Sequence, residues 1–157
     1  MVPARADACH LHRNRRRPPE HSGDTMQPHY EVAIVTILAL LVYLWMGLSV
    51  GPARAKSGIA APAMTGDPVL ERTIRVHYNT LEWLPLFLGG LWLFAIYWDD
   101  QIAAGVGVLW IIGRILYAVS YVADPGKRAA GFMIQTLATA VLLFGALGRI
   151  VWLMIQG

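Results

Sequence analysis

The sequence predicts an all-α integral membrane protein, a four-helix bundle in which the helices run up-down-up-down. Hydrophobic residues make up 56% of the 157 residues, and the mean hydropathy is +0.48. This composition is too apolar for an ordinary soluble domain. Four stretches reach the length of about 20 residues that a helix needs to cross a bilayer. The connections between them are short, so residues 29–157 are expected to form one transmembrane domain.

The first two helices are delimited by glycine, proline and aspartate. The first, about Tyr30 to Val50, has an uncharged span, and Gly51-Pro52 is expected to end it because proline cannot donate a backbone hydrogen bond. Glycine and proline in the following segment indicate turns. The second helix is expected from about Val69 to Trp98, and a tight Asp99-Asp100 connection follows.

The third and fourth helices are separated by a strong turn signal. The third is expected from about Ile102 to Val122, interrupted by a single charge, and Asp124-Pro125-Gly126 follows it. Lys127 and Arg128 are then expected to open the fourth helix, whose apolar part runs from Ala129 to Ile155.

The charges in the connections predict the orientation in the membrane. The first connection contains Arg54 and Lys56, and the third contains Lys127 and Arg128, so both are basic. The second connection is acidic, because it contains Asp99 and Asp100. The positive-inside rule places basic connections in the cytoplasm. We therefore expect a multi-pass protein of a bacterial inner membrane, with the polar ends of the second and third helices facing the cytoplasm.

Residues 1–28 are interpreted as a disordered basic tail, with an over-long start assignment upstream of Met26 as the alternative. Five of the 13 basic residues lie in the first 25 positions, so the net charge of +3 does not indicate a nucleic-acid-binding protein. The only cysteine, Cys9, is also in this tail. The membrane domain therefore has no thiol, and its sequence has no cluster with metal-ligand spacing.

A polar stripe marks the start of the second helix. Arg72, Arg75, Asn79 and Glu82 follow one another at spacings of three, four and three residues, which places them on one helix face. Charged groups in a membrane helix cost roughly 2.5–3.5 kcal/mol each at its centre, so they are usually paired and functional. The alternative reading of the two arginines is that they anchor the helix at the membrane surface.

The third helix carries a second stripe. Arg114, Tyr117 and Tyr121 are spaced by three and four residues. Two structural alternatives stay open at this point: a buried ion pair between Glu82 and Arg114, and tyrosines that serve only as interface aromatics.

Three motifs together resemble the MAPEG family, the membrane-associated proteins in eicosanoid and glutathione metabolism. The first is R-x-H-x-N-x-x-E-x-x-P, from Arg75 to Pro85, and T-G-D-P-x-x-E-R precedes it from Thr65 to Arg72. The third is R-x-x-Y-x-x-x-Y, from Arg114 to Tyr121. The resemblance covers about Tyr30 to Gln156, nearly all of the chain except the tail.

The resemblance implies a homotrimer that binds glutathione in clefts between neighbouring subunits, open to the cytoplasmic side. One subunit would hold the tripeptide through Arg75, Asn79, Glu82, Tyr117 and Tyr121. Arg54 and His77 would reach it from the next subunit. Arg128 matches the arginine that stabilises the glutathione thiolate.

These residue types suit that ligand. Glutathione carries two carboxylates and one ammonium; arginines bind carboxylates and a glutamate accepts an ammonium. A nearby arginine lowers the pKa of a thiol and so favours the nucleophilic thiolate. The chain departs from the pattern at Ala55, where leukotriene-synthesising relatives have a second arginine, and at Trp83, where a tyrosine often stands.

The sequence thus predicts an enzyme, a membrane-bound glutathione transferase with glutathione peroxidase activity as an addition. Its acceptors would be apolar electrophiles dissolved in the bilayer, and glutathione its co-substrate, with no metal. The alternative is a non-catalytic lipid-binding scaffold of the same family. A channel or transporter fits less well, because one polar layer traces no path across the membrane.

Overall fold

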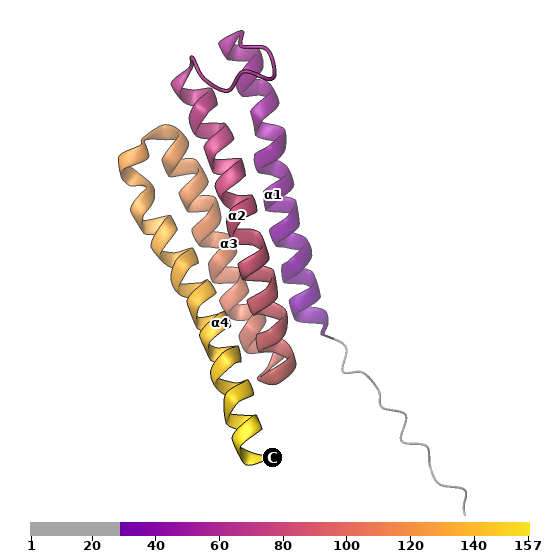
Figure 1. Cartoon of the computed structure of the whole chain (residues 1–157). Helices are drawn as coiled ribbons and strands as arrows, with labels where there is room; N and C mark the ends of the chain where they lie inside the picture. Colours follow the sequence, from indigo (N-terminus) through magenta and orange to yellow (C-terminus); the bar gives the residue numbers. More distant parts are fainter. Residues whose placement is uncertain (1–28) are drawn as a thin grey trace, which may run out of the picture.

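The structure is a computed structural model that describes residues 29–157. It contains α1 (Tyr30–Ser57), α2 (Pro68–Tyr97), α3 (Asp100–Ala123), the short 3₁₀ helix η1 (Pro125–Arg128) and α4 (Ala129–Gln156), shown in Figure 1. The predicted tail and Cys9 lie outside the described residues. All four long helices are long and apolar enough to span a membrane, which confirms the predicted all-α fold.

Consecutive helices run antiparallel, so the ends of the bundle differ. The α1–α2 loop and η1 lie at one end, and the tight α2–α3 turn lies at the other (Figure 1). Aspartates fix the starts of two helices: the Asp67 side chain accepts from Leu70 N and the Asp99 side chain from Ile102 N, both at 2.8 Å. We call the end with η1 the polar end.

The expected end of the first helix at Val50 is wrong, because α1 continues through Gly51-Pro52 to Ser57. The segment after Pro52 contains alanine, arginine and lysine, all strong helix formers, and basic residues stabilise the last turn of a helix. Gly58 then ends the helix in a left-handed conformation (φ 69°), and its N–H donates to Arg54 O. This extra length carries Arg54 beyond the apolar span.

The core closes around aromatic stacking below the polar end. Phe87 of α2 and Trp110 of α3 stack with ring centroids 3.9 Å apart. Nearer the polar end, α3 and α4 approach so closely that a Cβ on Gly131 would lie 2.3 Å from Tyr117 N. Only glycine permits this contact, which brings the start of α4 against Tyr117.

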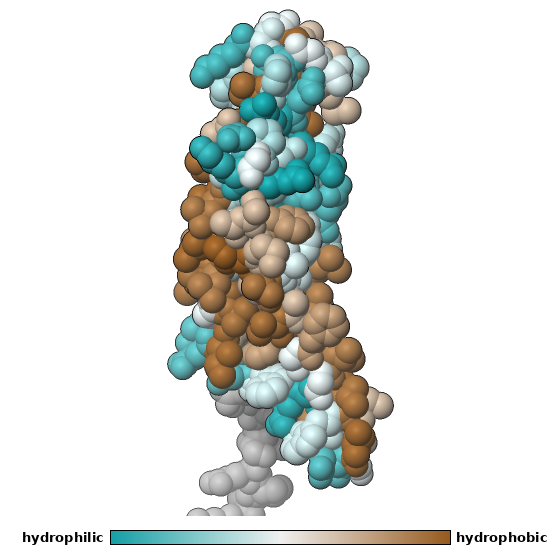
Figure 2. Space-filling view, turned by 90° about the vertical axis from the view of Figure 1, so that its left-hand side faces the viewer, coloured by the Kyte–Doolittle hydropathy of each residue, from teal (hydrophilic) through white to brown (hydrophobic). Residues whose placement is uncertain are grey.

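Hydropathy differs between the polar end and the middle of the bundle. Figure 2, which views the molecule from the left-hand side of Figure 1, shows a polar zone at the polar end above a broad apolar belt. Exposed aliphatic and aromatic side chains are expected where lipid, rather than water, covers a helix. The polar zone at the polar end is therefore accessible to a water-soluble ligand.

Candidate functional site

Helix α2 contributes a cation, an amide and a carboxylate to the polar end. Arg75 and Asn79 lie one turn apart, and Glu82 follows on the next turn. Glu82 Oε1 lies 3.7 Å from Arg75 Nη1, and Glu82 Oε2 accepts a hydrogen bond from Asn79 Nδ2 at 3.3 Å. More than half of the side chain of both Arg75 and Glu82 is exposed. Three residues of the predicted stripe are thus connected and open to a ligand, whereas the fourth, Arg72, donates to the main-chain oxygens of Val122 and Ala123 at the end of α3.

Helix α3 contributes two phenols. Tyr117 and Tyr121 lie one turn apart with their rings stacked, the centroids 5.5 Å apart. Tyr117 is only 4% exposed, whereas Tyr121 is partly exposed. The close passage of Gly131 across the Tyr117 backbone fixes where these rings stand relative to α4.

Arg128 reaches the same place from η1. The Asp124 side chain accepts from Gly126 N at 2.9 Å and folds the turn that starts α4. The Arg128 guanidinium carbon then lies 5.7 Å from the Tyr121 ring centroid, within cation–π range. Arg128 ends η1 and the α-helix begins one residue later, so the expectation that Lys127 and Arg128 open the fourth helix is corrected to a 3₁₀ turn.

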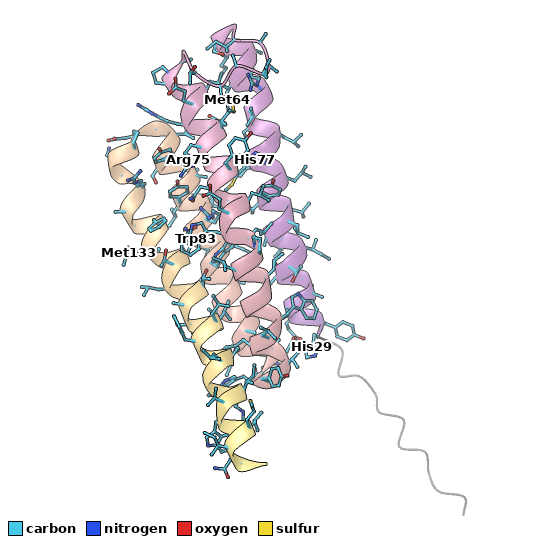
Figure 3. The ribbon with its side chains drawn as sticks, in the orientation of Figure 1. His29, Met64, Arg75, His77, Trp83 and Met133 are labelled. Atoms are coloured by element: carbon cyan, nitrogen blue, oxygen red, sulfur yellow. The ribbon has the colours of Figure 1, made fainter. Side chains whose placement is uncertain are left out.

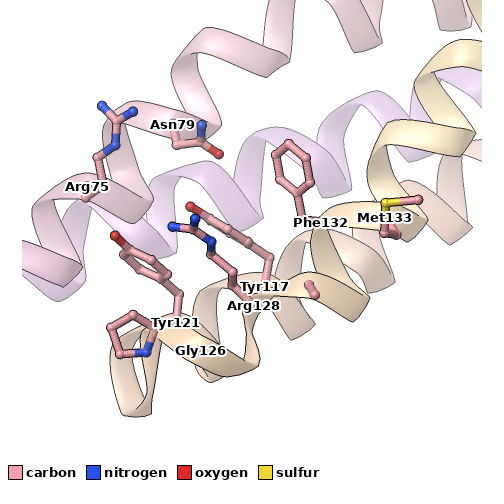
Figure 4. Close-up of a pocket in the computed structure, with 10 residues that line it drawn as sticks. Arg75, Asn79, Tyr117, Tyr121, Gly126, Arg128, Phe132 and Met133 are labelled. Atoms are coloured by element: carbon pink, nitrogen blue, oxygen red, sulfur yellow. The ribbon is translucent and has the colours of Figure 1, made fainter.

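These side chains line one cavity of about 540 Å³, a volume within the roughly 300–1,000 Å³ of small-molecule sites. Figure 4 shows the two tyrosines and Arg128 on one side of it and the α2 residues on the other. The residues that line it are Arg75, Asn79, Tyr117, Tyr121, Pro125, Gly126, Arg128, Ala129, Phe132 and Met133. Glu82 is not part of the lining but contacts two residues that are.

The alternative of a buried Glu82–Arg114 ion pair is wrong. Arg114 is 0% exposed, and its Nη1 donates to Asn79 Oδ1 at 3.0 Å and its Nη2 to Asn79 O at 3.3 Å. Its guanidinium also lies over the ring of Tyr117, 5.2 Å from the centroid. The carboxylate of Glu82 therefore forms no ion pair with Arg114 and lies 3.7 Å from the exposed cation of Arg75.

Two residues expected to bind the ligand lie away from this cavity within the chain. Figure 3 shows Arg75 on the side of α2 toward α3 and α4 and His77 on the side toward α1. The His77 ring stacks on Tyr43 with centroids 4.8 Å apart. Arg54 Nη1 donates to Ala63 O at 2.6 Å. Neither residue lines the cavity of its own chain.

The motifs missed the apolar wall of the cavity, formed by Phe132 and Met133 of α4. Phe132 also packs edge-on against Trp83, with ring centroids 5.6 Å apart. A signal existed in the sequence, since Phe132 follows Arg128 by four residues and so lies on the same face of a helical segment. Trp83, the residue that departs from the family pattern, therefore packs against this wall.

The arrangement suits a small anionic ligand. Arg75 and Arg128 supply two cations, Glu82 supplies a carboxylate with free lone pairs, and two phenols lie between them. Among residues 29–157, no group of three His, Cys, Asp or Glu side chains could hold a metal ion. The site can therefore bind opposite charges of one ligand and stabilise an anion beside Arg128.

Comparisons with known proteins agree with the three motifs. Residues 32–148 match the MAPEG family. An uncharacterized protein of Synechocystis is 51% identical over 76% of this chain and 88% of its own length. Human microsomal glutathione S-transferase 2 is 37% identical over 74% of this chain and 80% of its own length. Guinea pig leukotriene C4 synthase is 32% identical over 71% of this chain and 75% of its own length. The chain belongs to the MAPEG family.

Proposed function

We propose that this protein is a membrane-bound glutathione transferase that conjugates glutathione to apolar electrophiles dissolved in the bilayer. One observation carries the proposal: Arg75, Asn79, Tyr117, Tyr121 and Arg128 line a single cavity at the polar end. The name of the microsomal relative, a glutathione S-transferase, supports glutathione as the co-substrate.

The γ-glutamyl end of the ligand finds two matching groups. The γ-glutamyl end of glutathione carries an ammonium beside a carboxylate, and the Glu82 and Arg75 side chains lie side by side, 3.7 Å apart. Arg75 binds the carboxylate and Glu82 the ammonium, both through charge-assisted hydrogen bonds. In the free protein the two side chains pair with each other, which costs little to break because both are exposed.

Arg128 is the proposed catalytic residue. Its guanidinium favours the thiolate of bound glutathione, whose proton passes to water. With a chlorodinitrobenzene as the acceptor, the sulfur forms a bond to the ring carbon, the carbon–chlorine bond breaks, and chloride leaves with the bonding pair. Phe132 and Met133 give the acceptor an apolar surface on the side of the cavity formed by α4.

The assembly and orientation are part of the same proposal. Neither Arg54 nor His77 lines the cavity within its own chain. In the proposed homotrimer, Arg54 and His77 of a neighbouring copy would reach it instead. The basic connections at the polar end support a cytoplasmic site in a bacterial inner membrane.

A lipid-binding scaffold without turnover is the second candidate, and a separate groove favours it. This groove of about 340 Å³ runs between α1, α2 and α3. It is mostly apolar, with lining residues that include Trp45, Met46, Val76 and Val119. An acyl chain fits such a surface, whereas a tripeptide with three charges does not.

A reconstituted assay separates the two candidates. Purified protein in lipid vesicles is mixed with glutathione and a chlorodinitrobenzene, and the conjugate is followed by absorbance. We expect turnover by the wild type and by the control Arg149→Ala, whose cation lies over Trp152 at the other end of α4. Absence of turnover, with fatty acid retained and no measurable glutathione affinity, would establish the scaffold instead.

A further inference from the structure

Arg114 is a buried cation in a membrane helix that the proposed chemistry does not use. It is 0% exposed, and its guanidinium carbon lies 5.4 Å from the ring centroid of Trp110 and 5.2 Å from that of Tyr117. No carboxylate oxygen of residues 29–157 lies within ion-pair distance of it. Charges at this depth are rare and usually functional.

Both hydrogen bonds from Arg114 end on one residue, Asn79. Nη1 donates to the side-chain oxygen of Asn79, and Nη2 donates to its main-chain oxygen. A guanidinium has five donors and no acceptor. Asn79 must therefore turn its amide oxygen toward Arg114, and its NH₂ group must point the other way.

The NH₂ group of Asn79 points to Glu82. It donates to Glu82 Oε2 at 3.3 Å, while Oε1 of the same carboxylate faces Arg75. If the amide were reversed, it would present an oxygen to a carboxylate, which is repulsive. Glu82 would then lose a hydrogen bond and be free to move toward Arg75. The orientation of the Asn79 amide thus decides how the carboxylate is presented to a ligand.

We propose that Arg114 is a positioning residue that fixes the Asn79 amide, and through it the Glu82 carboxylate, so that the site selects ligands with an amino group beside a carboxylate. The inference rests on the proposed function and names the part of the ligand that is recognised. Arg114 acts on the γ-glutamyl end, whereas Arg128 acts on the sulfur.

This division predicts a specific effect. Loss of Arg114 weakens binding of ligands that carry the amino group and leaves ligands without it nearly unaffected. It also leaves the rate of conjugation at saturating glutathione close to that of the wild type, so the effect is on KM rather than kcat. A residue that merely held the bundle together would weaken both ligands alike.

The experiment measures the affinity of the full-length protein in lipid nanodiscs for two ligands by calorimetry. One ligand is glutathione; the other is glutaryl-cysteinylglycine, the same molecule without the α-amino group. A charge-assisted hydrogen bond corresponds to a preference of about tenfold in affinity for glutathione. We expect Arg114→Met to reduce this preference to about twofold or less, and Arg114→Lys, which keeps a buried donor, to retain part of it.

Gln135→Leu is the matched control. Gln135 is also 0% exposed, and neither atom of its side-chain amide bonds to another of the described residues. Leucine is close to glutamine in size, so the replacement removes buried polarity while the hydrogen bonds of Asn79 stay in place. We expect this variant to keep the tenfold preference.

The outcomes distinguish the inference from the function on which it rests. A wild type that binds neither ligand overturns both. A wild type that prefers glutathione, with Arg114→Met preferring it equally, overturns only the role of Arg114. A wild type that binds both ligands equally overturns the ammonium contact of Glu82 and with it the role of Arg114, and leaves the thiolate chemistry at Arg128 standing. If Arg114→Met does not fold, Arg114→Lys keeps the buried charge but not the planar pair of donors that reaches both oxygens of Asn79, and it must reduce the preference for the inference to stand.

Discussion

The two sides of α2 at the polar end differ in whether their polar side chains line a cavity or are packed against another helix. The cavity face, Arg75 and Asn79, lines a cavity with α3, η1 and α4. The α1 face, His77 and Thr80, is packed: His77 stacks on Tyr43, and Thr80 Oγ1 donates to Met46 Sδ at 3.0 Å. Both faces carry polar groups of one motif. Polarity in a membrane helix therefore does not by itself mark a ligand site, because the neighbouring helix decides whether a polar group is free.

The difference follows from how closely the neighbouring elements approach each face of α2. On the α1 face, Gly47 lets the imidazole of His77 fit against α1, with the position of a Cβ there 3.2 Å from His77 Nε2. On the cavity face, the turn Pro125–Arg128 forms part of the wall of a cavity that stays open between α2, α3 and α4. If the two faces also differ in function, substitutions on the cavity face should change ligand binding and catalysis more than substitutions on the α1 face.

The largest expected effect is on the sulfur of bound glutathione. Arg128→Ala removes the cation that favours the thiolate, so a higher pH is needed to form it; we expect a shift of about two pH units, roughly 2.7 kcal/mol. Thiolate formation is followed by ultraviolet absorbance as glutathione is added across a pH series. Arg149→Ala, at the far end of α4, should leave the curve in place, and an unshifted curve for Arg128→Ala would remove Arg128 from the mechanism.

The next effect concerns the contact that places Tyr117. Gly131→Ala puts a Cβ 2.3 Å from Tyr117 N and 2.7 Å from Gly113 O, and backbone atoms cannot yield as a flexible side chain does. We expect a loss of about 2 kcal/mol in the free energy of unfolding. Thermal unfolding in detergent is the measurement.

Gly148→Ala on the same helix is the matched control for that loss. A Cβ at Gly148 meets nothing within 4 Å, so alanine should stabilise the helix there by about 0.5–1 kcal/mol. Opposite signs for the two variants are the expected result. Equal effects would mean that the approach of α3 and α4 at Gly131 is not tight, and the cavity face would lose its structural explanation.

A third test addresses the carboxylate of the cavity face. Glu82→Gln keeps the shape but removes the charge that binds an ammonium, and we expect about a tenfold loss of glutathione affinity. Calorimetry on the reconstituted protein measures it. Glu71→Gln is the control, because Glu71 Oε1 only accepts from Gly66 N, which an amide oxygen can also do. Equal affinity in wild type and Glu82→Gln would exclude the ammonium contact.

The four-helix fold could be predicted from the sequence, because four apolar spans and helical spacing are local signals. The spacing of Arg75 to Asn79 and of Tyr117 to Tyr121 placed each pair on one face, and the structure brings both pairs to one cavity. These features depend only on the period of a helix. The sequence did not predict that α1 continues through Pro52. A membrane helix tolerates the missing backbone donor of proline when the residues that follow favour a helix.

The partners of the polar side chains could not be predicted from the sequence, because they depend on contacts between helices. The spacing could not tell whether Arg114 meets Glu82 or Asn79, because both lie on α2 within one turn of each other. It could not show that His77 stacks on Tyr43 rather than standing free. The roles of Arg54 and His77 depend on a neighbouring copy and stay predictions.

The smallest effect decides whether the α1 face takes part at all. His77→Phe keeps a ring to stack on Tyr43, so the free energy of unfolding should change by less than about 0.5 kcal/mol. It removes both ring nitrogens, and if a neighbouring subunit uses one to bind glutathione, affinity should fall about two- to threefold, the worth of one neutral hydrogen bond. We expect that fall, measured by calorimetry on the assembled protein in nanodiscs. Unchanged affinity with unchanged stability would assign His77 to packing alone, because the stacked ring would then account for all that the residue does.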